Sequence, residues 1–203
     1  MKKPDYSRAD YYSKKAKAHG FPARSVFKLQ ELDNRFKIFS KAMRVLDLGA
    51  SPGSWIKYAS EKVGDSGFVL GIDRNPLKLP LNFNENFIQA DIFNLNPLDL
   101  KTKFGSFDLI LSDLSPDLMG QKSTDALRAI SLAERAFKFA EILLKPGGNF
   151  LVKVFEGPGY EDFYKFLKGS FASVNSSKPK SSRPNSREMY IYCKGFLVGK
   201  IKE

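Results

Sequence analysis

One lysine lies inside an otherwise apolar segment. Lys153 is the fifth residue of the run NFLVKVF, residues 149–155, and no acidic residue in that run can pair with it. A charged amine among apolar side chains loses its hydration, which costs free energy. Such a lysine either extends to the end of its strand, where water reaches the ammonium, or is held in place for chemistry. The surroundings of Lys153 favour the second interpretation.

Three other charged residues can join Lys153 if the fold gathers them. Asp113 ends a predicted strand that a parallel sheet would place beside the strand of Lys153, so that both side chains meet at one edge of the sheet. Lys28 lies on a predicted helix, and Glu188 begins the last predicted strand. Taken singly, Lys28 and Glu188 are interpreted as surface or ion-paired charges.

A glycine-containing turn follows the first predicted strand. In the sequence DLGASPGSW, Gly49 and Gly53 let the backbone turn tightly and approach a ligand without a Cβ in the way. The spacing is neither G-x-G-x-x-G, which binds dinucleotides, nor G-x-x-x-x-G-K-[ST], which binds nucleoside triphosphates. The turn therefore lacks a known phosphate-binding pattern.

Two acids follow the next two predicted strands. Asp73, twenty residues after Gly53, can accept hydrogen bonds from both hydroxyls of a ribose. Asp91 can accept a hydrogen bond from an adenine amino group. Each feature alone is more simply an ordinary strand–helix turn or a loop cap. The ordered set, without a phosphate cradle, fits S-adenosylmethionine, which carries an adenosine but no phosphate.

The positive charge is concentrated in two segments. Of the net charge of +11, residues 1–30 carry +6 and residues 178–187 carry +4. Such clusters bind phosphate-rich polymers, because each Lys or Arg near the backbone releases condensed counterions. The candidate nucleic-acid contacts are Lys14, Lys15, Lys17, Arg24, Lys178, Lys180, Arg183 and Arg187. Aromatic residues within the first cluster can stack on unpaired bases, namely Tyr6, Tyr11, Tyr12 and Phe21.

Two other interpretations of this charge stay open. Residues 1–12, taken alone, are equally consistent with a solvated, disordered tail. An anionic membrane surface would also attract both clusters. Residues 178–187, however, are rich in Ser and Pro and lack the apolar helical face that a membrane-lying helix needs.

Composition excludes several classes of protein. Apolar residues make up 42% of the 203 residues, which is enough for a sizeable core and excludes a wholly disordered chain. No apolar run approaches the ~20 residues of a membrane helix, and the N-terminus lacks the apolar stretch of a secretory signal. A single cysteine, Cys193, and a single histidine, His19, exclude an internal disulfide and a Cys/His zinc cage. We therefore expect no metal and a reducing, cytoplasmic setting.

Predicted strands and helices alternate along the chain. The predicted helices cover residues 23–38, 54–63, 124–144 and 160–167. The predicted strands cover residues 44–48, 68–73, 86–90, 107–113, 149–155, 171–174 and 188–196. This alternation predicts an α/β fold with a mostly parallel sheet and helices on both faces. The last two strands lack a helix between them, so they should pair antiparallel at the sheet edge. We expect one domain over residues 1–203, with the basic N-terminal segment and helix, residues 1–37, packed on it.

Five segments carry a resemblance to a known family. They are ARSVFKL (23–29), LDLGASPGSW (46–55), SDLSP (112–116), VKVF (152–155) and SSRPNSREMY (181–190). Through these segments the chain resembles the FtsJ/RrmJ family of 2′-O-ribose RNA methyltransferases from about residue 23 to residue 196. The order Lys–Asp–Lys–Glu is the specific part of the match, since a glycine turn alone is common.

The resemblance implies a Rossmann-like methyltransferase fold, a seven-stranded sheet with an antiparallel edge strand, and S-adenosylmethionine as cofactor. It implies a catalytic tetrad made of Lys28, Asp113, Lys153 and Glu188. It also implies a cofactor site lined by Gly53, Trp55, Asp73, Asp91 and Asp113. In this family, short bacterial members act on a uridine of large-subunit ribosomal RNA, a related branch acts on tRNA anticodon loops, and others act on mRNA caps.

The four tetrad residues have distinct expected roles. Lys153 is the expected general base, and burial together with the charge of Lys28 favours the neutral amine that a base must present. Asp113 is expected to orient Lys153 and the ribose 2′-hydroxyl, and Glu188 to balance Lys28. RNA is expected to lie across the tetrad, held by the two basic segments of a monomeric enzyme.

Two short segments depart from the family pattern. Phe21-Pro22 stands where the family often has Tyr-Arg, and Ser115-Pro116-Asp117 stands where it often has Ala-Pro-Asn. An acid near the expected RNA entrance leaves the substrate open between ribosomal RNA and a tRNA anticodon loop. A non-catalytic RNA-binding module on the same fold is the alternative of another class, whereas the basic clusters disfavour a small-molecule methyltransferase.

Overall fold

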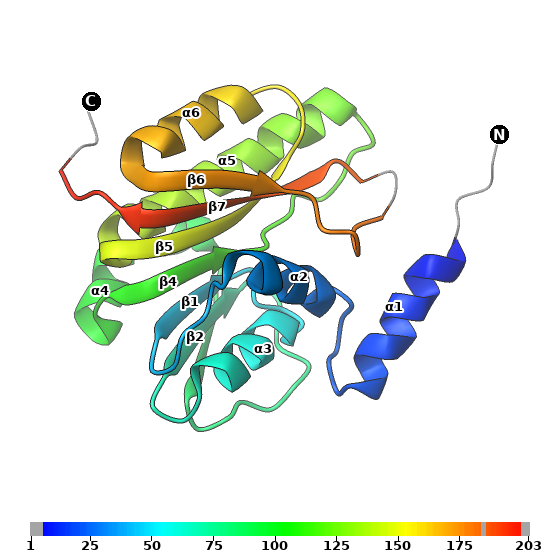
Figure 1. Cartoon of the computed structure of the whole chain (residues 1–203), viewed down its shortest axis with the longest axis horizontal. Coiled ribbons are helices and arrows are strands. Elements are labelled where there is room, and N and C mark those ends of the chain that lie inside the picture. Colours follow the sequence, from blue (N-terminus) through cyan, green and yellow to red (C-terminus); the bar gives the residue numbers. More distant parts are fainter. Residues whose placement is uncertain (1–5, 184–185, 200–203) are drawn as a thin grey trace.

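The computed structural model describes residues 6–183 and 186–199 and contains one seven-stranded sheet, in the order β3-β2-β1-β4-β5-β7-β6 (Figure 1). The strands are β1 (Arg44–Leu48), β2 (Phe68–Asp73), β3 (Glu85–Gln89), β4 (Phe107–Ser112), β5 (Leu144–Phe155), β6 (Phe171–Ser177) and β7 (Glu188–Phe196). The pairs from β3 to β5 are parallel, whereas β7 is antiparallel to both of its neighbours.

The antiparallel pairing predicted for the last two strands is confirmed, with one correction. The strand that runs against the others is β7, and it lies one place in from the edge, between β5 and β6. The edge strand β6 runs in the same direction as β5. The chain crosses from β5 to β6 through a helix, which keeps the direction, and the loop after β6 then turns the chain back into the gap between them.

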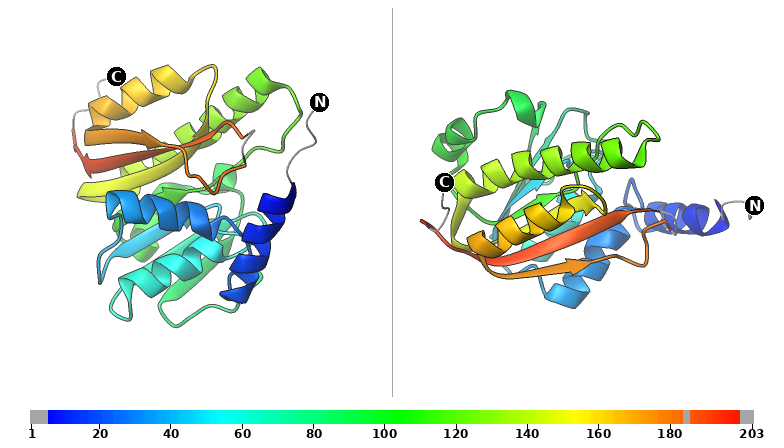
Figure 2. Two further views of the ribbon diagram at one scale, coloured as in Figure 1. Left: turned by 45° about the vertical axis from the view of Figure 1, so that its right-hand side comes forward. Right: turned by 90° about the horizontal axis from the view of Figure 1, so that it is seen from above.

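Helices cover both faces of the sheet, as predicted (Figure 2). They are α1 (Tyr6–Ala18), α2 (Val26–Phe36), α3 (Ser54–Val63), α4 (Pro97–Phe104), α5 (Lys122–Leu143) and α6 (Tyr160–Ser170), with a short 3-10 helix η1 (Ile92–Asn94). Successive strand residues point to opposite faces, so Val45 belongs to the core cluster on the side of α2 and α3, while Leu46 belongs to the cluster on the side of α5 and α6. None of the helices in the described ranges is both long and apolar enough to cross a membrane.

Several elements differ from the sequence prediction: η1 was not predicted, and β6 extends to Ser177, beyond the predicted end at residue 174. Helices α1 and α4 were not predicted, because neither has a regular apolar stripe. Helix α4 is instead set by its start, where Pro97 begins the helix and the Asn96 side chain accepts a hydrogen bond from the Leu98 N–H. Strand β5 begins at Leu144, so residues 145–148, predicted as a break between helix and strand, lie within the strand.

Helix α1 lies apart from the sheet, beyond the end toward which the parallel strands run (Figures 1 and 2). It contacts α2 through the Tyr12 ring, whose centre lies 5.5 Å from that of Phe27, and its Ala16 is buried in the same core cluster as Phe27. The tail interpretation of residues 1–12 fails from Tyr6 onward, while residues 1–5 lie outside the described part of the chain. The basic N-terminal segment thus stands at the same end of the molecule as the strand ends that position the candidate site.

Candidate active site

The structure places Lys153 against Asp113 at the carboxyl end of β4. The parallel register sets Ser112 opposite Val152. The residues that follow them, Asp113 and Lys153, are therefore also neighbours. The Lys153 Nζ donates a 2.6 Å hydrogen bond to the backbone carbonyl of Asp113 and lies 3.1 Å from its Oδ1. Lys153 is only 6% exposed. Its ammonium therefore turns to a buried partner and does not extend into open water.

Lys28 and Glu188 form a second ion pair beside the first. Lys28 lies in the first turn of α2, Glu188 begins β7, and their Nζ and Oε2 atoms are 2.8 Å apart. Both side chains are largely buried, so water screens their attraction only weakly. In the β5–β7 register, Glu188 is opposite Phe155, two residues beyond Lys153. The fold thus gathers all four residues of the predicted tetrad.

Tyr190 links the tetrad from its buried side and was missed by the sequence analysis. It is opposite Lys153 in the β5–β7 register, and its hydroxyl donates a 2.7 Å hydrogen bond to Asp113 Oδ1. Burial raises the pKa of Tyr190 well above its ordinary value, and the carboxylates of Asp113 and Glu188 raise it further. The phenol therefore stays protonated as a donor. An aromatic residue in a strand gives no sequence signal beyond core packing.

Asp113 is held in its ionised form. Burial alone would raise the pKa of Asp113, but the positive charges of Lys153 and Lys28 and the hydrogen bond from Tyr190 together lower it below its ordinary value. The carboxylate therefore accepts from the Tyr190 hydroxyl and attracts the Lys153 ammonium at the same time.

A cavity of about 410 Å³ opens beside the tetrad at the carboxyl ends of β1, β2 and β4. Four of the predicted cofactor residues line it, namely Gly49, Asp73, Asp91 and Asp113. A Cβ on Gly49 would lie 3.0 Å from the backbone nitrogen of Leu114, and its φ of 87° also favours glycine. Because Asp113 belongs to both the cavity and the tetrad, a ligand in the cavity lies next to Lys153.

Asp73 and Asp91 organise the loops around this cavity. The Asp73 carboxylate accepts hydrogen bonds from the backbone N–H of Ser51, at 3.0 Å, and of Asn75, at 2.7 Å. It thereby ties the turn after β1 to the turn after β2. Asp91 accepts a 2.9 Å hydrogen bond from the Phe93 N–H and caps η1. Asp73 and Asp91 therefore both cap loops and line the cavity.

The other two predicted cofactor residues, Gly53 and Trp55, do not line this cavity. Gly53 is beside a smaller hollow of about 130 Å³ on the other side of the turn. Trp55 is buried, and its indole N–H donates a 3.0 Å hydrogen bond to the Ser25 carbonyl. Its ring centre lies 5.9 Å from that of Tyr190, so Trp55 packs behind the tetrad.

Comparison with known proteins identifies the family of the chain. A family model described as FtsJ-like methyltransferase matches residues 21–196, which is most of the chain. The chain belongs to the FtsJ-like methyltransferase family. The resemblance read from its motifs, and the methyltransferase fold expected with it, are thus confirmed.

Relatives match this family member over almost their whole length. One from Desulfatibacillum aliphaticivorans, named ribosomal RNA large subunit methyltransferase E, is 47% identical over 90% of this chain and 88% of its own. One of the same name from Bdellovibrio bacteriovorus is 42% identical over 98% of this chain and 99% of its own. A crystal structure described as a ribosomal RNA methyltransferase from Plasmodium falciparum is 33% identical, with a TM-score of 0.76 over 86% of this chain and 98% of that one.

The predicted RNA contacts of this methyltransferase fall into two groups. Lys14, Lys15 and Lys17 lie on α1, and the Lys15 Nζ is 5.4 Å from the centre of the Phe27 ring. The others are Arg24, just before α2, and the basic residues of the segment between β6 and β7. Burial and the charge of Arg183 lower the pKa of Arg24, whereas Glu188 raises it, which places these groups close together.

The second basic segment lies beside the Lys28–Glu188 ion pair, and its described residues are 178–183, 186 and 187. Lys178, Lys180 and Arg183 are exposed there. Arg187 is anchored to backbone instead, because it donates hydrogen bonds to the carbonyls of Lys122, at 2.6 Å, and Glu156, at 3.3 Å.

The unexpected acid of the methyltransferase, Asp117, has a partner across the cavity mouth. Arg74, which follows β2, donates from Nη2 to both carboxylate oxygens of Asp117, at 2.9 and 3.1 Å, and both residues line the cavity. This hydrogen bond raises the pKa of Arg74. The acid at position 117 is therefore paired within the chain, although the side chains of both partners are exposed.

Asp47 is a second residue that the sequence analysis did not single out as a site residue. It lies in β1 with no exposed surface, and neither carboxylate oxygen has a hydrogen-bond partner among the described residues. Burial raises the pKa of Asp47 well above its ordinary value, and the charges of Asp113 and Asp73 raise it further. The sequence signal is a lone acid inside the strand RVLDL.

No group of three or more His, Cys, Asp or Glu side chains within the described ranges is placed to hold a metal ion.

Replacing Asp47 with asparagine is expected to change how stability depends on pH. Because its folded-state pKa is raised, wild type loses stability as pH rises above the ordinary value of 3.8, until the folded-state pKa is passed. Asparagine cannot ionise, so the advantage of Asp47→Asn in unfolding free energy should grow over that range by at most about 1.4 kcal/mol per pH unit. Urea unfolding at about pH 5 and about pH 8 measures this. Equal differences at both pH values would show that Asp47 does not carry the penalty.

Proposed function

We propose that this enzyme transfers the methyl group of S-adenosylmethionine to the 2′-hydroxyl of a ribose in large-subunit ribosomal RNA, in the cytoplasm. The observation that carries the proposal is the buried Lys153–Asp113 pair at the rim of an acid-lined cavity. Support for the RNA class comes from relatives named ribosomal RNA large subunit methyltransferase E, which align over nearly the whole chain.

The cavity fits S-adenosylmethionine better than a nucleotide. The four aspartates on its wall outnumber its two arginines, so the net negative charge repels phosphate and attracts the positive charge of a sulfonium ion. A carboxylate has about four acceptor positions, so Asp73 keeps capacity for ribose hydroxyls beside its two backbone donors. Asp91 likewise keeps capacity for an adenine amino group. Gly53 and Trp55 would serve this site indirectly, through the shape of the turn and the packing behind Tyr190.

The chain itself must orient one hydroxyl and remove one proton. S-adenosylmethionine, when bound, supplies a methyl group activated by its sulfonium. Only the neutral amine can act as base, so Lys153 would first release its own proton to solvent. Its Nζ would then take the proton of the 2′-hydroxyl as the oxygen accepts the methyl group and the sulfur keeps the electron pair of the broken carbon–sulfur bond. The ammonium that results is held by the two oxygens of Asp113 that already contact Nζ. The Lys28–Glu188 pair completes the wall around this position.

RNA reaches this point over a basic surface. Arg24 and the exposed basic residues of the segment after β6 flank the Lys28–Glu188 pair, and α1 stands at the same end of the molecule (Figure 1). We propose that these cations hold the phosphates on either side of the target nucleotide.

A methyl-transfer assay with tritium-labelled S-adenosylmethionine tests the substrate class. The acceptors are large ribosomal subunits from a host that lacks the enzyme, total tRNA, and a nuclease-treated sample of the same subunits. We expect label on the large subunits and its loss after nuclease treatment. Label on tRNA alone would overturn the ribosomal assignment, and RNA binding without any transfer would identify a non-catalytic module.

A further inference from the structure

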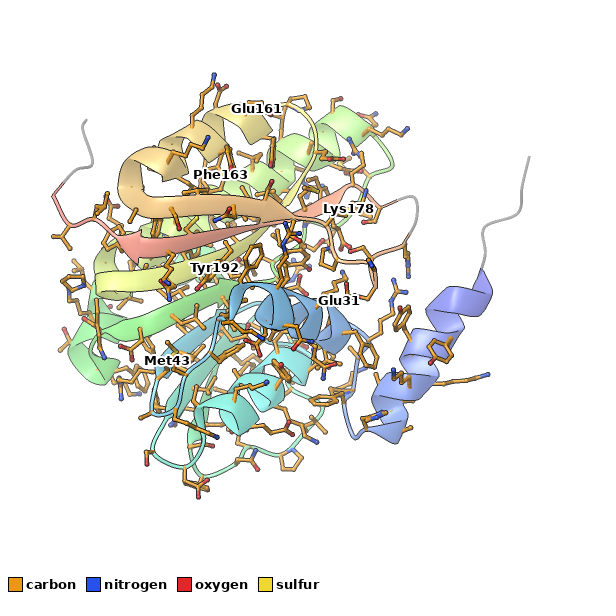
Figure 3. All side chains as sticks on the ribbon, viewed as in Figure 1. Glu31, Met43, Glu161, Phe163, Lys178 and Tyr192 are labelled. Atoms are coloured by element: carbon orange, nitrogen blue, oxygen red, sulfur yellow. The ribbon has the colours of Figure 1, made fainter. Side chains whose placement is uncertain are left out.

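Three polar side chains form one stripe along α2. Lys28, Glu31 and Arg35 are three and four residues apart, which places them on the same face of the helix. Lys28 belongs to the tetrad. Glu31 faces the segment that follows β6, and Arg35 faces the last residue of β6. Figure 3 shows Glu31 on α2 below the stretch that carries Lys178. Neither Glu31 nor Arg35 lines the cavity beside the tetrad.

Glu31 holds two consecutive backbone groups of the basic segment. Its Oε2 accepts a 2.6 Å hydrogen bond from the Lys180 N–H, and its Oε1 accepts a 3.0 Å hydrogen bond from the Ser181 N–H. These residues are 149 and 150 positions away in sequence, so the contact joins two distant parts of the fold. A carboxylate is the side chain suited to this geometry, because both of its oxygens accept and neither donates.

The same helix face holds both ends of the basic segment. One turn beyond Glu31, the Arg35 Nη1 donates a 2.9 Å hydrogen bond to the hydroxyl of Ser177, the last residue of β6. At the other end, Lys28 pairs with Glu188, the first residue of β7. Helix α2 therefore contacts the chain both where the basic segment leaves β6 and where it enters β7. The contact at β7 is the Lys28–Glu188 ion pair of the tetrad.

We propose that Glu31 is a positioning residue that fixes the basic segment relative to the tetrad, so that RNA bound by Lys178, Lys180 and Arg183 presents its ribose at Lys153. This inference rests on the proposed RNA substrate. Glu31 itself touches neither the cavity nor the tetrad pair Lys153–Asp113. It acts by ordering the backbone of residues 178–183, which lowers the conformational entropy that RNA binding would otherwise have to remove.

The positioning role of Glu31 and its negative charge predict opposite effects of Glu31→Ala on RNA binding. Removing an acid from a surface that binds RNA should strengthen binding if charge alone matters. If Glu31 positions the segment, Glu31→Ala should instead raise the KM for large ribosomal subunits about tenfold, because two hydrogen bonds to a charged acceptor are lost. The affinity for S-adenosylmethionine, measured by calorimetry, and kcat at saturating subunits should stay within about twofold.

Two further variants separate position from charge. Glu31→Gln removes the same charge but keeps one acceptor oxygen, so it should recover part of the lost affinity. Glu61→Ala removes a charge from an exposed position on α3, the neighbouring helix, where the side chain makes no hydrogen bond or ion pair with any described residue. This variant should leave KM unchanged or slightly lower. Equal KM values for Glu31→Ala and Glu61→Ala would overturn the positioning role.

Hydrogen exchange gives a readout that does not depend on activity. In wild type, the amides of Lys180 and Ser181 should exchange slowly, and in Glu31→Ala both should lose protection while the amides of β5 and β7 keep it. Loss of protection throughout the sheet would mean that the variant is globally unstable, and would contradict a local role. If wild type methylates no RNA, the proposed function fails; if it does and Glu31→Ala keeps its KM, only this inference fails.

Discussion

Replacing Lys153 with methionine is expected to lower kcat for methyl transfer by about a hundred- to ten-thousand-fold. Methionine has a similar length and no basic nitrogen, so the strand stays filled while the proton acceptor is lost. Lys153 lies among apolar core residues and contacts Asp113 through two oxygens, so no other amine described near the cavity has the same position. Single-turnover transfer of labelled methyl to large ribosomal subunits measures the change.

A lysine on the same strand provides the matched control. Lys145 lies near the amino end of β5, half-exposed, and pairs with Asp108 at 2.6 Å. Lys145→Met makes the same chemical change far from the cavity and should leave kcat within about twofold, because an exposed pair contributes little. Cofactor affinity should be close to wild type in both variants. If Lys153→Met keeps kcat within tenfold of wild type, Lys153 is not the base.

The second large effect is expected from Asp73. Replacing it with alanine removes the acceptor proposed for the ribose of S-adenosylmethionine and releases the backbone N–H groups of Ser51 and Asn75. We expect the Kd for S-adenosylmethionine to rise about a hundredfold, since hydrogen bonds to a charged group are among the stronger ones. At saturating cofactor, kcat should fall much less. Isothermal titration calorimetry measures the Kd directly.

Two control variants test whether the effect is specific to the Asp73 carboxylate. Asp65→Ala removes an exposed acid near the amino end of β2, opposite the end that carries Asp73, and should bind the cofactor like wild type. Asp73→Asn keeps one acceptor oxygen and should lie between wild type and Asp73→Ala. A Kd for Asp73→Ala within threefold of wild type would remove Asp73 from the binding site.

The Lys153–Asp113 half of the tetrad could be predicted from strand order, whereas Lys28 and Glu188 were assigned to it only through the family resemblance. Asp113 ends one strand and Lys153 lies within the next, and adjacent parallel strands bring their carboxyl ends together. Tyr190 could not be found this way. Its hydrogen bond to Asp113 depends on the β5–β7 register, which places Tyr190 opposite Lys153, and a single sequence does not state that register.

The cofactor side was predicted less completely. Gly49, Asp73 and Asp91 line the cavity because each lies where a strand of the sheet ends. Gly53 and Trp55 lie close to them in sequence, but the turn directs Gly53 to another hollow and α3 buries Trp55 against Tyr190. Helix α1 escaped prediction for a different reason. Only Ala16 is buried among its residues with described side chains, so it has no apolar stripe to detect.

The position of the transferred methyl group tests the central claim most directly. After the reaction with labelled S-adenosylmethionine, the ribosomal RNA is purified and hydrolysed completely in alkali. In alkali, the deprotonated 2′-hydroxyl attacks the neighbouring phosphodiester and cleaves the chain. A methyl group on the 2′-oxygen prevents this attack, so the label should appear in alkali-resistant dinucleotides. Label released as mononucleotides would show that the methyl group is on a base, and would contradict transfer to a ribose hydroxyl at Lys153.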